Sequence, residues 1–326
     1  MAAKGIQAPQ EVADFIRAHG RFIILGHKEP DGDCISSQLA FAHLLEQLGK
    51  EHRLVSAGPF DRPEIAPYEG LFARDVDEGM LAGAVIVILD CSTPDRTGEP
   101  GEKVAGLPTL VIDHHSSGEV FGDVRFVVPT APSSTLLVLA IVDLFGFPLT
   151  AAQAQLILFG LCTDTGFFRH LGHRSDAVFL SIARLVEAGT STAEVYHMVH
   201  GRRDLASRKL LATMLQRTES HLGDRLLVSW QTVEDRARLG GNLRGDDDLY
   251  RLLQTVKDNE VVAFIKEEEP ERFSVGLRSN RDVDVGAIAA SFGGGGHRQA
   301  AGCDMRGTLE SVKKTVIEAL VSKLQL

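Results

Sequence analysis

Three short apolar runs in the first half of the chain each end directly in acidic or histidine residues. Residues 22–25 are followed by His27, Asp31 and Asp33, residues 85–89 by Asp90, and residues 109–112 by Asp113, His114 and His115. Short runs of aliphatic and β-branched residues are typical of buried strands. Segments of helical periodicity lie between them, including a helix over 134–145 that Ser133 could cap. Strands alternating with helices predict an α/β fold with a doubly wound, mainly parallel sheet.

The second half of the chain has a different pattern. The stretch 204–219 contains neither proline nor glycine and predicts one long helix. Strands are expected at 225–230, 260–266 and 272–277, and helices near 249–257 and 309–324. We therefore expect an N-terminal domain over 1–190, a helical connector over 191–220 and a smaller α/β domain over 221–326.

Composition narrows the class of protein. The 326 residues are 44% hydrophobic and 24% charged, as in globular domains. Residues 1–15 lack the apolar run of a secretion signal, and the densest apolar stretch, 136–142, is far shorter than a membrane span of about 20 residues. We therefore expect a soluble, cytoplasmic protein with no membrane partner. The four cysteines form no C-x-x-C pair, which predicts neither a thiolate zinc site nor a disulfide framework.

The net charge of −10 argues against a protein that coats duplex DNA. A nucleic-acid ligand of this chain is expected to be short and to be held locally, through metal ions and a few arginines.

The residues that end the strands predict a metal site. In open α/β sheets, ligands gather at the carboxyl ends of the strands, so the three segments should converge on one crevice. A further acid, Asp164, follows an apolar helix. An aspartate after a strand is often only a turn residue or a cap. Five carboxylates and three imidazoles gathered together would, however, repel one another without cations, and this set of ligands suits Mn²⁺ or Mg²⁺.

The order of these residues resembles a known family. His-x-x-x-Asp-x-Asp, a strand-terminal Asp, Asp-His-His and a later Asp look like the four motifs of the DHH phosphoesterase superfamily. The glycine-rich segment 292–302 resembles the DHH-associated C-terminal domain. The compact layout is similar to the bacterial nanoRNase/pAp-phosphatase (NrnA-like) group. The resemblance implies a catalytic domain over 1–190 and a substrate-binding domain over 221–326.

The resemblance also implies roles for individual residues. Two divalent ions are expected, Mn²⁺ in preference to Mg²⁺ or Co²⁺. One ion would be held by His27, Asp31 and Asp90, and the other by Asp33, Asp90, His114 and Asp164. Asp90 would bridge the two ions. His115 would bind the scissile phosphate or protonate the leaving oxygen, and Asp113 would orient a ligating imidazole from behind.

The C-terminal half should supply the substrate contacts. Four consecutive glycines can form a flexible linker, but here they follow an apolar segment and precede His297. That position favours a loop whose backbone N–H groups approach a phosphate. The expected contacts are Arg278, Ser279, Gly295, Gly296 and His297, with Arg278 gripping a phosphate through two hydrogen bonds.

The resemblance implies hydrolysis of short oligoribonucleotides to 5′-mononucleotides, and of 3′-phosphoadenosine 5′-phosphate to AMP. A phosphodiesterase for cyclic dinucleotides or their linear products is the alternative. The glycine-rich segment disfavours an inorganic pyrophosphatase. A nucleotide-binding regulatory protein without turnover is disfavoured because every candidate ligand is present. The sequence leaves a homodimer open.

Overall fold

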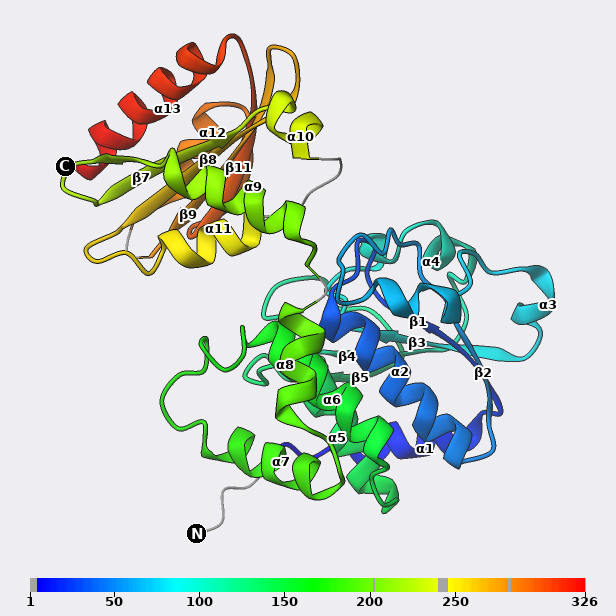
Figure 1. Cartoon of the computed structure of the whole chain (residues 1–326). Coiled ribbons are helices and arrows are strands. Elements are labelled where there is room, and N and C mark those ends of the chain that lie inside the picture. The colour runs from blue at the N-terminus through cyan, green and yellow to red at the C-terminus, as the bar shows by residue number, and fades with distance from the viewer. Residues whose placement is uncertain (1–4, 202, 240–245, 281–282, 326) are drawn as a thin grey trace. The chain divides into compact units, whose positions relative to one another are not determined.

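The computed structural model describes residues 5–201, 203–239, 246–280 and 283–325. The chain divides into two compact units, Met1–Arg202 and Arg203–Leu326 (Figure 1). The expected connector over 191–220 contains two helices that belong to different units. α8 (Thr192–His200) is part of the first unit and α9 (Leu205–Gln216) is part of the second.

The first unit contains a five-stranded sheet in which every pairing is parallel, in the order β2-β1-β3-β4-β5. Its strands are β1 (Arg21–Leu25), β2 (Glu51–Leu54), β3 (Ala84–Leu89), β4 (Thr109–Asp113) and β5 (Val124–Val127). Leu25 is paired with Ile88, and Leu89 with Ile112, so β1, β3 and β4 end nearly level with one another. The predicted α/β fold is confirmed.

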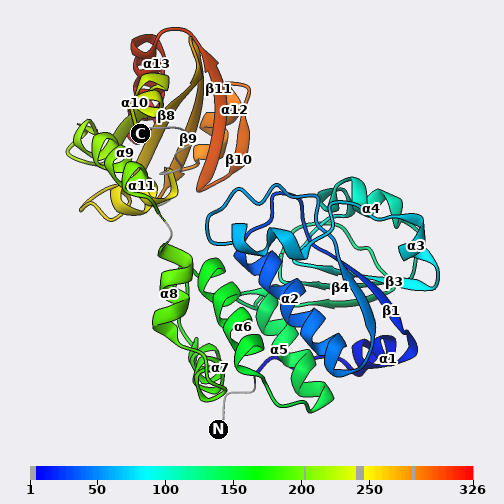
Figure 2. The ribbon, with the colours of Figure 1, turned by 45° about the vertical axis from the view of Figure 1, so that its right-hand side comes forward.

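Helices cover both faces of this sheet. The larger core packs alternate strand residues such as Phe22 and Val87 against α1, α2, α5 and α6, and the smaller core packs Ile23 and Ile86 on the other face. α2, α5 and α6 lie side by side (Figure 2). The helices are α1 (Gln10–Ala18), α2 (Gly32–Gln47), α3 (Glu78–Leu81), α4 (Glu99–Lys103), α5 (Ser134–Phe145), α6 (Ala151–Asp164) and α7 (Asp176–Glu187), with 3₁₀ turns at Ala66–Leu71 and Pro94–Thr97.

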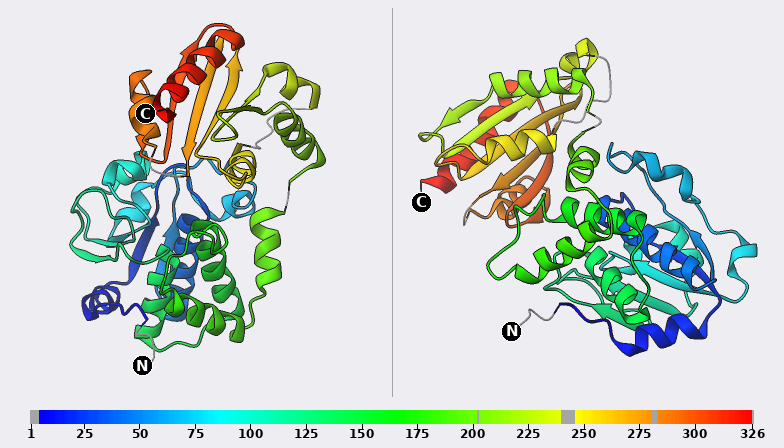
Figure 3. Two further views of the ribbon diagram at one scale, coloured as in Figure 1. Left: turned by 90° about the vertical axis from the view of Figure 1, so that its left-hand side faces the viewer. Right: turned by 60° about the horizontal axis from the view of Figure 1, so that its bottom comes forward.

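The second unit is built on a mixed sheet in the order β10-β11-β9-β8-β7-β6 (Figure 3). Among the described pairings only β7–β8 is parallel. The strands are β6 (Glu219–His221), β7 (Leu226–Gln231), β8 (Val261–Glu269), β9 (Arg272–Ser279), β10 (Gly295–His297) and β11 (Ala300–Arg306). One face packs on α12 (Val285–Ser291) and α13 (Leu309–Leu324), and the other on α9 and α11 (Asp246–Leu253). α10 spans Val233–Leu239.

Two local expectations differ from the structure. The long helix predicted to continue to Glu219 ends at Gln216, and Glu219 instead begins β6, where it pairs with Val228. Strand pairing with β7 therefore overrides the local helix propensity of this segment. The glycine-rich segment is not a free loop over its whole length, because Gly295–His297 forms an edge strand paired with β11.

Glycine in α6 allows the close packing beneath the carboxyl edge of the sheet. A methyl group on Gly160 would lie 2.3 Å from Ser36 Oγ and 2.9 Å from Asp33 Oδ1. α2 and α6 therefore approach more closely at this point than any other residue would permit.

Within the described residues, no helix combines the length and the apolar character that crossing a bilayer requires.

Candidate metal centre

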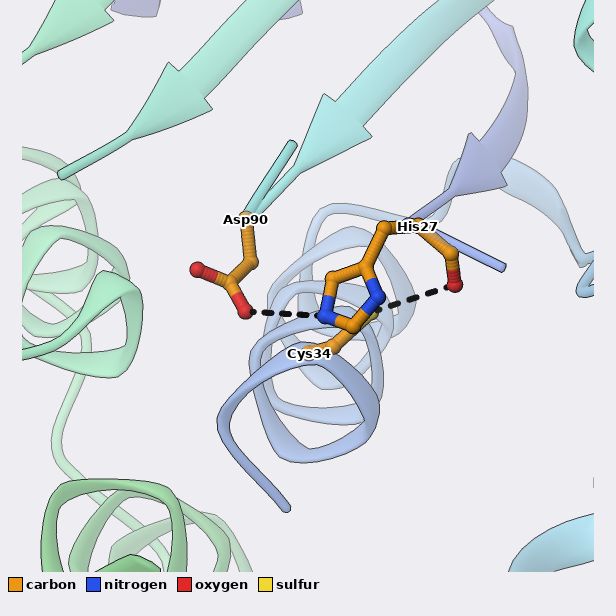
Figure 4. Close-up of side chains that lie close together, drawn as sticks. All are labelled: His27, Cys34 and Asp90. Atoms are coloured by element: carbon orange, nitrogen blue, oxygen red, sulfur yellow. Dashed lines mark hydrogen bonds and ion pairs between the residues drawn. The ribbon is translucent and has the colours of Figure 1, made fainter. Parts of the chain in front are cut away.

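The topology of the first sheet fixes where a ligand can bind. The strand order reverses between β1 and β3, since the chain passes from β1 outward to β2 and then returns to β3 on the other side. Such a switch point opens a crevice at the carboxyl ends of the two strands. His27 lies just beyond β1 and Asp90 directly beyond β3, and His27 Nε2 is 3.6 Å from Asp90 Oδ2 (Figure 4).

The first turn of α2 supplies two more predicted ligands. Asp31 is the N-cap residue, and its Oδ1 accepts a hydrogen bond from the Cys34 N–H at 3.1 Å. The same oxygen lies 3.9 Å from His27 Nε2. Asp33 lies two residues further along, in the first turn of α2, and is completely buried. α2 therefore delivers both carboxylates of the Asp-x-Asp motif to the switch point.

The remaining predicted ligands come from β4 and α6. His114 Nε2 lies 3.4 Å from Asp90 Oδ1 and 3.4 Å from Asp164 Oδ2, so it stands between the two carboxylates. Ligand atoms of Asp33, His114 and Asp164 all lie within 4.8 Å of one another, a spacing that could hold a metal ion. All six side chains predicted as ligands thus gather in one cluster, with Asp90 at its centre.

Hydrogen bonds fix the tautomers of the two imidazoles. The Nδ1–H of His27 donates to the Lys28 carbonyl at 2.8 Å, and the Nδ1–H of His114 donates to the Ala131 carbonyl at 3.1 Å. Carbonyl oxygens only accept, so Nδ1 carries the proton in each neutral ring. Nε2 is therefore the nitrogen that faces the carboxylates, and it is the one that would bind a metal ion once its own proton has left. Histidine ligands of metals are commonly oriented by such a hydrogen bond on the opposite nitrogen.

The charges of the cluster are strongly coupled. Burial disfavours the charged imidazolium, but the hydrogen bond to Asp90 and the surrounding carboxylates outweigh it and raise the pKa of His114 to about 10. Burial raises the pKa of Asp164 to about 6, with Asp90 and Asp31 adding to the effect. Burial and the same crowding raise the pKa of Asp33. In the absence of cations, protons partly neutralise the negative charge of these carboxylates, and divalent cations would neutralise it more completely. The set of oxygen and imidazole ligands suits Mn²⁺ or Mg²⁺.

The N-terminus of α5 supports two of these carboxylates, which the sequence did not indicate. Asp33 accepts hydrogen bonds from the backbone N–H groups of Ser134 at 2.6 Å and Thr135 at 3.1 Å. The Ser134 hydroxyl donates to Asp90 Oδ1 at 3.0 Å. Ser133, the expected helix cap, makes no side-chain cap hydrogen bond. Asp33, which belongs to α2, caps the N-terminus of α5 instead. Its carboxylate also lies at the positive end of the α5 helix dipole.

The two remaining residues of the Asp-His-His motif form a pair. The Nδ1–H of His115 donates to Asp113 Oδ1 at 2.7 Å, and the same oxygen accepts from the backbone N–H of His114 at 2.8 Å. The hydrogen bond to Asp113 raises the pKa of His115. Asp113 therefore contacts the ring of His115 directly and the predicted ligand His114 only through its backbone N–H.

Cys34 lies against the cluster without carrying a charge. Its Sγ, His27 and Asp90 lie within 4.8 Å of one another (Figure 4). The side chain is fully buried, and this burial raises the pKa of the thiol, so the neutral form is favoured. Cys34 therefore adds a sulfur atom, and not a further negative charge, beside His27 and Asp90.

The second unit carries a pocket of about 750 Å³ on one face of its sheet. Arg278, Gly295 and Gly296 line it, and the Arg278 guanidinium lies 4.6 Å above the ring of Tyr250. Among the described residues, the lining does not include Ser279 or His297, which were also expected to contact substrate. Ser279 is buried in β9, whereas His297 is exposed on β10.

Comparison with known proteins agrees with this geometry. Residues 21–161 match the model of the DHH family, N-terminal domain, and residues 246–325 match the DHHA1 domain. The bifunctional oligoribonuclease and PAP phosphatase NrnA of Thermus thermophilus is 32% identical over 320 residues, which cover 96% of this chain and 93% of the relative. The chain belongs to the DHH family.

Solved structures share the fold of this DHH protein. An exopolyphosphatase-related protein from Bacteroides fragilis superposes with a TM-score of 0.85 at 22% identity, covering 96% of this chain and 95% of that protein. Exonuclease RecJ bound to manganese superposes with a TM-score of 0.55 at 15% identity, covering 99% and 96%. The expected membership of the DHH superfamily is confirmed, and a member of this fold binds manganese.

Replacing Ser134 with alanine should weaken metal binding, because the Asp90 carboxylate then loses the hydroxyl that holds its Oδ1. Loss of such a supporting hydrogen bond commonly costs 10- to 100-fold in metal affinity, and we expect a loss of about that size. The measurement is a calorimetric titration of the metal-free protein with Mn²⁺. Ser133→Ala is the matched control, since Ser133 is equally buried and its hydroxyl bonds to Thr135. Equal affinities of the two variants would contradict this supporting role.

Mn²⁺ binding should release protons and weaken as the pH falls. His114 has a pKa of about 10 and so holds a proton near neutral pH, and a cation must displace that proton from Nε2. Below about pH 6, Asp164 is protonated as well, so the loss of affinity should steepen there. Titrations in buffers of different ionisation enthalpy report the number of protons released. An affinity independent of pH would refute this competition.

Proposed function

We propose that this DHH protein hydrolyses short oligoribonucleotides to 5′-mononucleotides, and 3′-phosphoadenosine 5′-phosphate to AMP, with two divalent ions, preferentially Mn²⁺. The observation that carries the proposal is the cluster at the switch point, in which two imidazole Nε2 atoms and four carboxylates face one another. The near full-length similarity to an oligoribonuclease and PAP phosphatase supports the choice of substrate.

We assign the six ligands to two sites that share Asp90. His27, Asp31 and Asp90 would hold one ion, and Asp33, Asp90, His114 and Asp164 the other. When bound, a pair of such ions lowers the pKa of a shared water and neutralises charge on the phosphoryl oxygens. Asp90 suits the bridging position because each of its two oxygens faces a different imidazole, Oδ2 toward His27 and Oδ1 toward His114.

His115 is proposed to act on the scissile phosphate and the leaving oxygen. Its side chain is 32% exposed, more than either predicted ligand imidazole, so a substrate can reach it. Asp113 accepts the hydrogen bond from its Nδ1–H, so Nε2 is the nitrogen that would meet a phosphate oxygen. The hydrogen bond to Asp113 raises the pKa of His115 and so favours the protonated ring, the form that binds an anion and donates a proton to a leaving alkoxide.

Arg278 is the proposed phosphate contact of the second unit. Its guanidinium lies over the Tyr250 ring and donates one hydrogen bond to the Leu277 carbonyl at 3.0 Å, and the side chain lines the pocket with Gly295 and Gly296. A guanidinium has five N–H donors in a planar fork, so donors beyond the one used by Leu277 would bind a phosphate. Ser279 and His297 remain proposed as further contacts.

A substrate panel tests the proposed function directly. With Mn²⁺, the wild-type chain should release mononucleotides from a short RNA and phosphate from 3′-phosphoadenosine 5′-phosphate, and should process long RNA poorly. Asp90→Ala should abolish turnover, since both ions lose a ligand, whereas Glu78→Ala on the exposed surface should not. Including cyclic dinucleotides and pyrophosphate in the panel distinguishes the alternatives. Preferential turnover of either, or no turnover at all, would overturn the proposal.

Replacing Arg278 with alanine should raise KM for short substrates with little change in kcat. Hydrogen bonds to charged groups contribute roughly 1.5–3 kcal/mol, so the increase should be about 10- to 150-fold. Steady-state kinetics on a dinucleotide measure it. Arg306→Ala provides the control, because Arg306 is exposed at the end of β11 and outside the pocket lining. An unchanged KM in the Arg278 variant would remove this residue from the substrate site.

A further inference from the structure

A continuous group of aromatic rings lies in the first unit, beyond the metal cluster. We call Phe167, Phe168, Phe179, Tyr196 and His200 the aromatic platform. Neighbouring ring centroids are 5.2 Å apart for Phe167–Phe168, 5.8 Å for Phe168–Phe179, 5.3 Å for Phe167–Tyr196 and 4.7 Å for Tyr196–His200. The rings come from the turn after α6, from α7 and from α8, so three separate segments converge on this surface.

Part of the platform is open to solvent. Phe179 is 53% exposed and Tyr196 is 47% exposed, whereas Phe167 and Phe168 are half-buried beneath them. Rings of this size dominate the energetics of cores and interfaces when they are covered. Two half-exposed aromatic side chains that are joined through the rings of Phe168 and Phe167 therefore indicate a surface that a ligand covers.

The turn that carries the platform is strained and is tied to the metal cluster. Phe167 and Phe168 both have positive φ values, 56° and 74°, which cost bulky residues about 1–3 kcal/mol each. The strain is held by hydrogen bonds from the Phe167 N–H to the Cys162 carbonyl at 2.7 Å and from the Phe168 N–H to Thr165 Oγ1 at 3.1 Å. Asp164 is three residues before Phe167, so their Cα atoms lie within about 11 Å.

The platform is bordered by basic residues although the chain as a whole is acidic. Residues 166–175, in the segment that carries Phe167 and Phe168, contain two exposed arginines and two exposed histidines and no acid, and the ring of His197 lies 6.1 Å from that of Tyr196 on α8. The net charge of the chain is −10, so this local excess of cationic groups is not a general property of the surface. Aromatic rings among basic residues are typical of surfaces that bind single-stranded nucleic acid.

We propose that the aromatic platform is a binding site for the unpaired bases of short single-stranded RNA, with Phe179 and Tyr196 as the stacking residues. This inference rests on the proposed function and adds a substrate site to it. Only unpaired bases expose a face for stacking, so the platform favours single strands over duplexes. A second copy of the chain is a poorer occupant, because a twofold contact would bring the two basic borders together.

The test measures binding separately from turnover. A fluorescently labelled single-stranded tetra-adenylate is titrated with the full-length chain in EDTA, and its affinity is read by anisotropy. Stacking contributes about 1–3 kcal/mol per base, so Phe179→Ala and Tyr196→Ala should each weaken binding by about tenfold or more. Tyr196→Trp, which keeps an aromatic ring at this position, should bind tetra-adenylate about as tightly as the wild type. Leu180→Ala is the matched control, because Leu180 is 54% exposed and adjoins Phe179 on α7 without offering a ring.

A base-free oligomer of ribose phosphate provides the second control, since it should bind the wild-type chain as weakly as the alanine variants bind tetra-adenylate. The inference would be overturned if Phe179→Ala and Tyr196→Ala bound tetra-adenylate as tightly as the wild type does. It would also be overturned if Leu180→Ala lost as much affinity as these two variants. A variant that dissociates a dimer without changing the RNA affinity would instead assign the surface to self-association. If the wild-type chain binds tetra-adenylate through the platform but releases no mononucleotides in Mn²⁺, the proposed function is refuted while the aromatic binding site is still supported.

Discussion

Burying two carboxylates, those of Asp33 and Asp90, is the constraint around which the first unit is built. Both are almost completely removed from water, and an uncompensated buried charge is costly. The protein compensates with the backbone N–H groups at the start of α5, with the Ser134 hydroxyl, and with imidazoles on either side of Asp90. These contacts connect α2, β3 and α5 at the carboxyl edge of the sheet. The glycine in α6 leaves room for that connection.

The same arrangement separates the chemical roles of neighbouring residues. His114 and His115 are adjacent in sequence, yet His114 Nε2 lies 3.4 Å from both Asp90 and Asp164, whereas His115 Nδ1 lies 2.7 Å from Asp113 and 3.8 Å from Asp90. One ring is therefore directed into the cluster, and the other stands at its border with more exposure. The backbone N–H of His114 bonds to the Asp113 carboxylate, so a single side chain fixes the positions of both histidines.

Much of the centre could be predicted because the relevant residues end strands. A parallel sheet with a switch point brings strand ends together, so His27, Asp90 and His114 could be placed near one another before any coordinates were known. The support from Ser134 could not be predicted in this way. Its contact with Asp90 and the contact of its N–H with Asp33 join positions 44 and 101 residues apart, and a serine at the start of a helix looks like an ordinary cap.

Other features were obscured by local sequence signals. The segment before Glu219 has good helix formers, but the end of the helix is decided by pairing with β7. Gly295 and Gly296 look like a free loop, yet they form an edge strand because Gly302 and Ala301 lie opposite them. Phe167 and Phe168 resemble core residues in a sequence, and only their positive φ values and partial exposure distinguish them. Tertiary pairing and backbone conformation, rather than composition, determine each of these.

In the proposed site one buried carboxylate, that of Asp90, bridges two cations at the switch point. Anomalous diffraction from a crystal soaked in manganese would show this bridge. We expect two peaks roughly 3.5–4 Å apart, one on each side of the Asp90 carboxylate. A single peak, or two peaks that do not share Asp90, would contradict it.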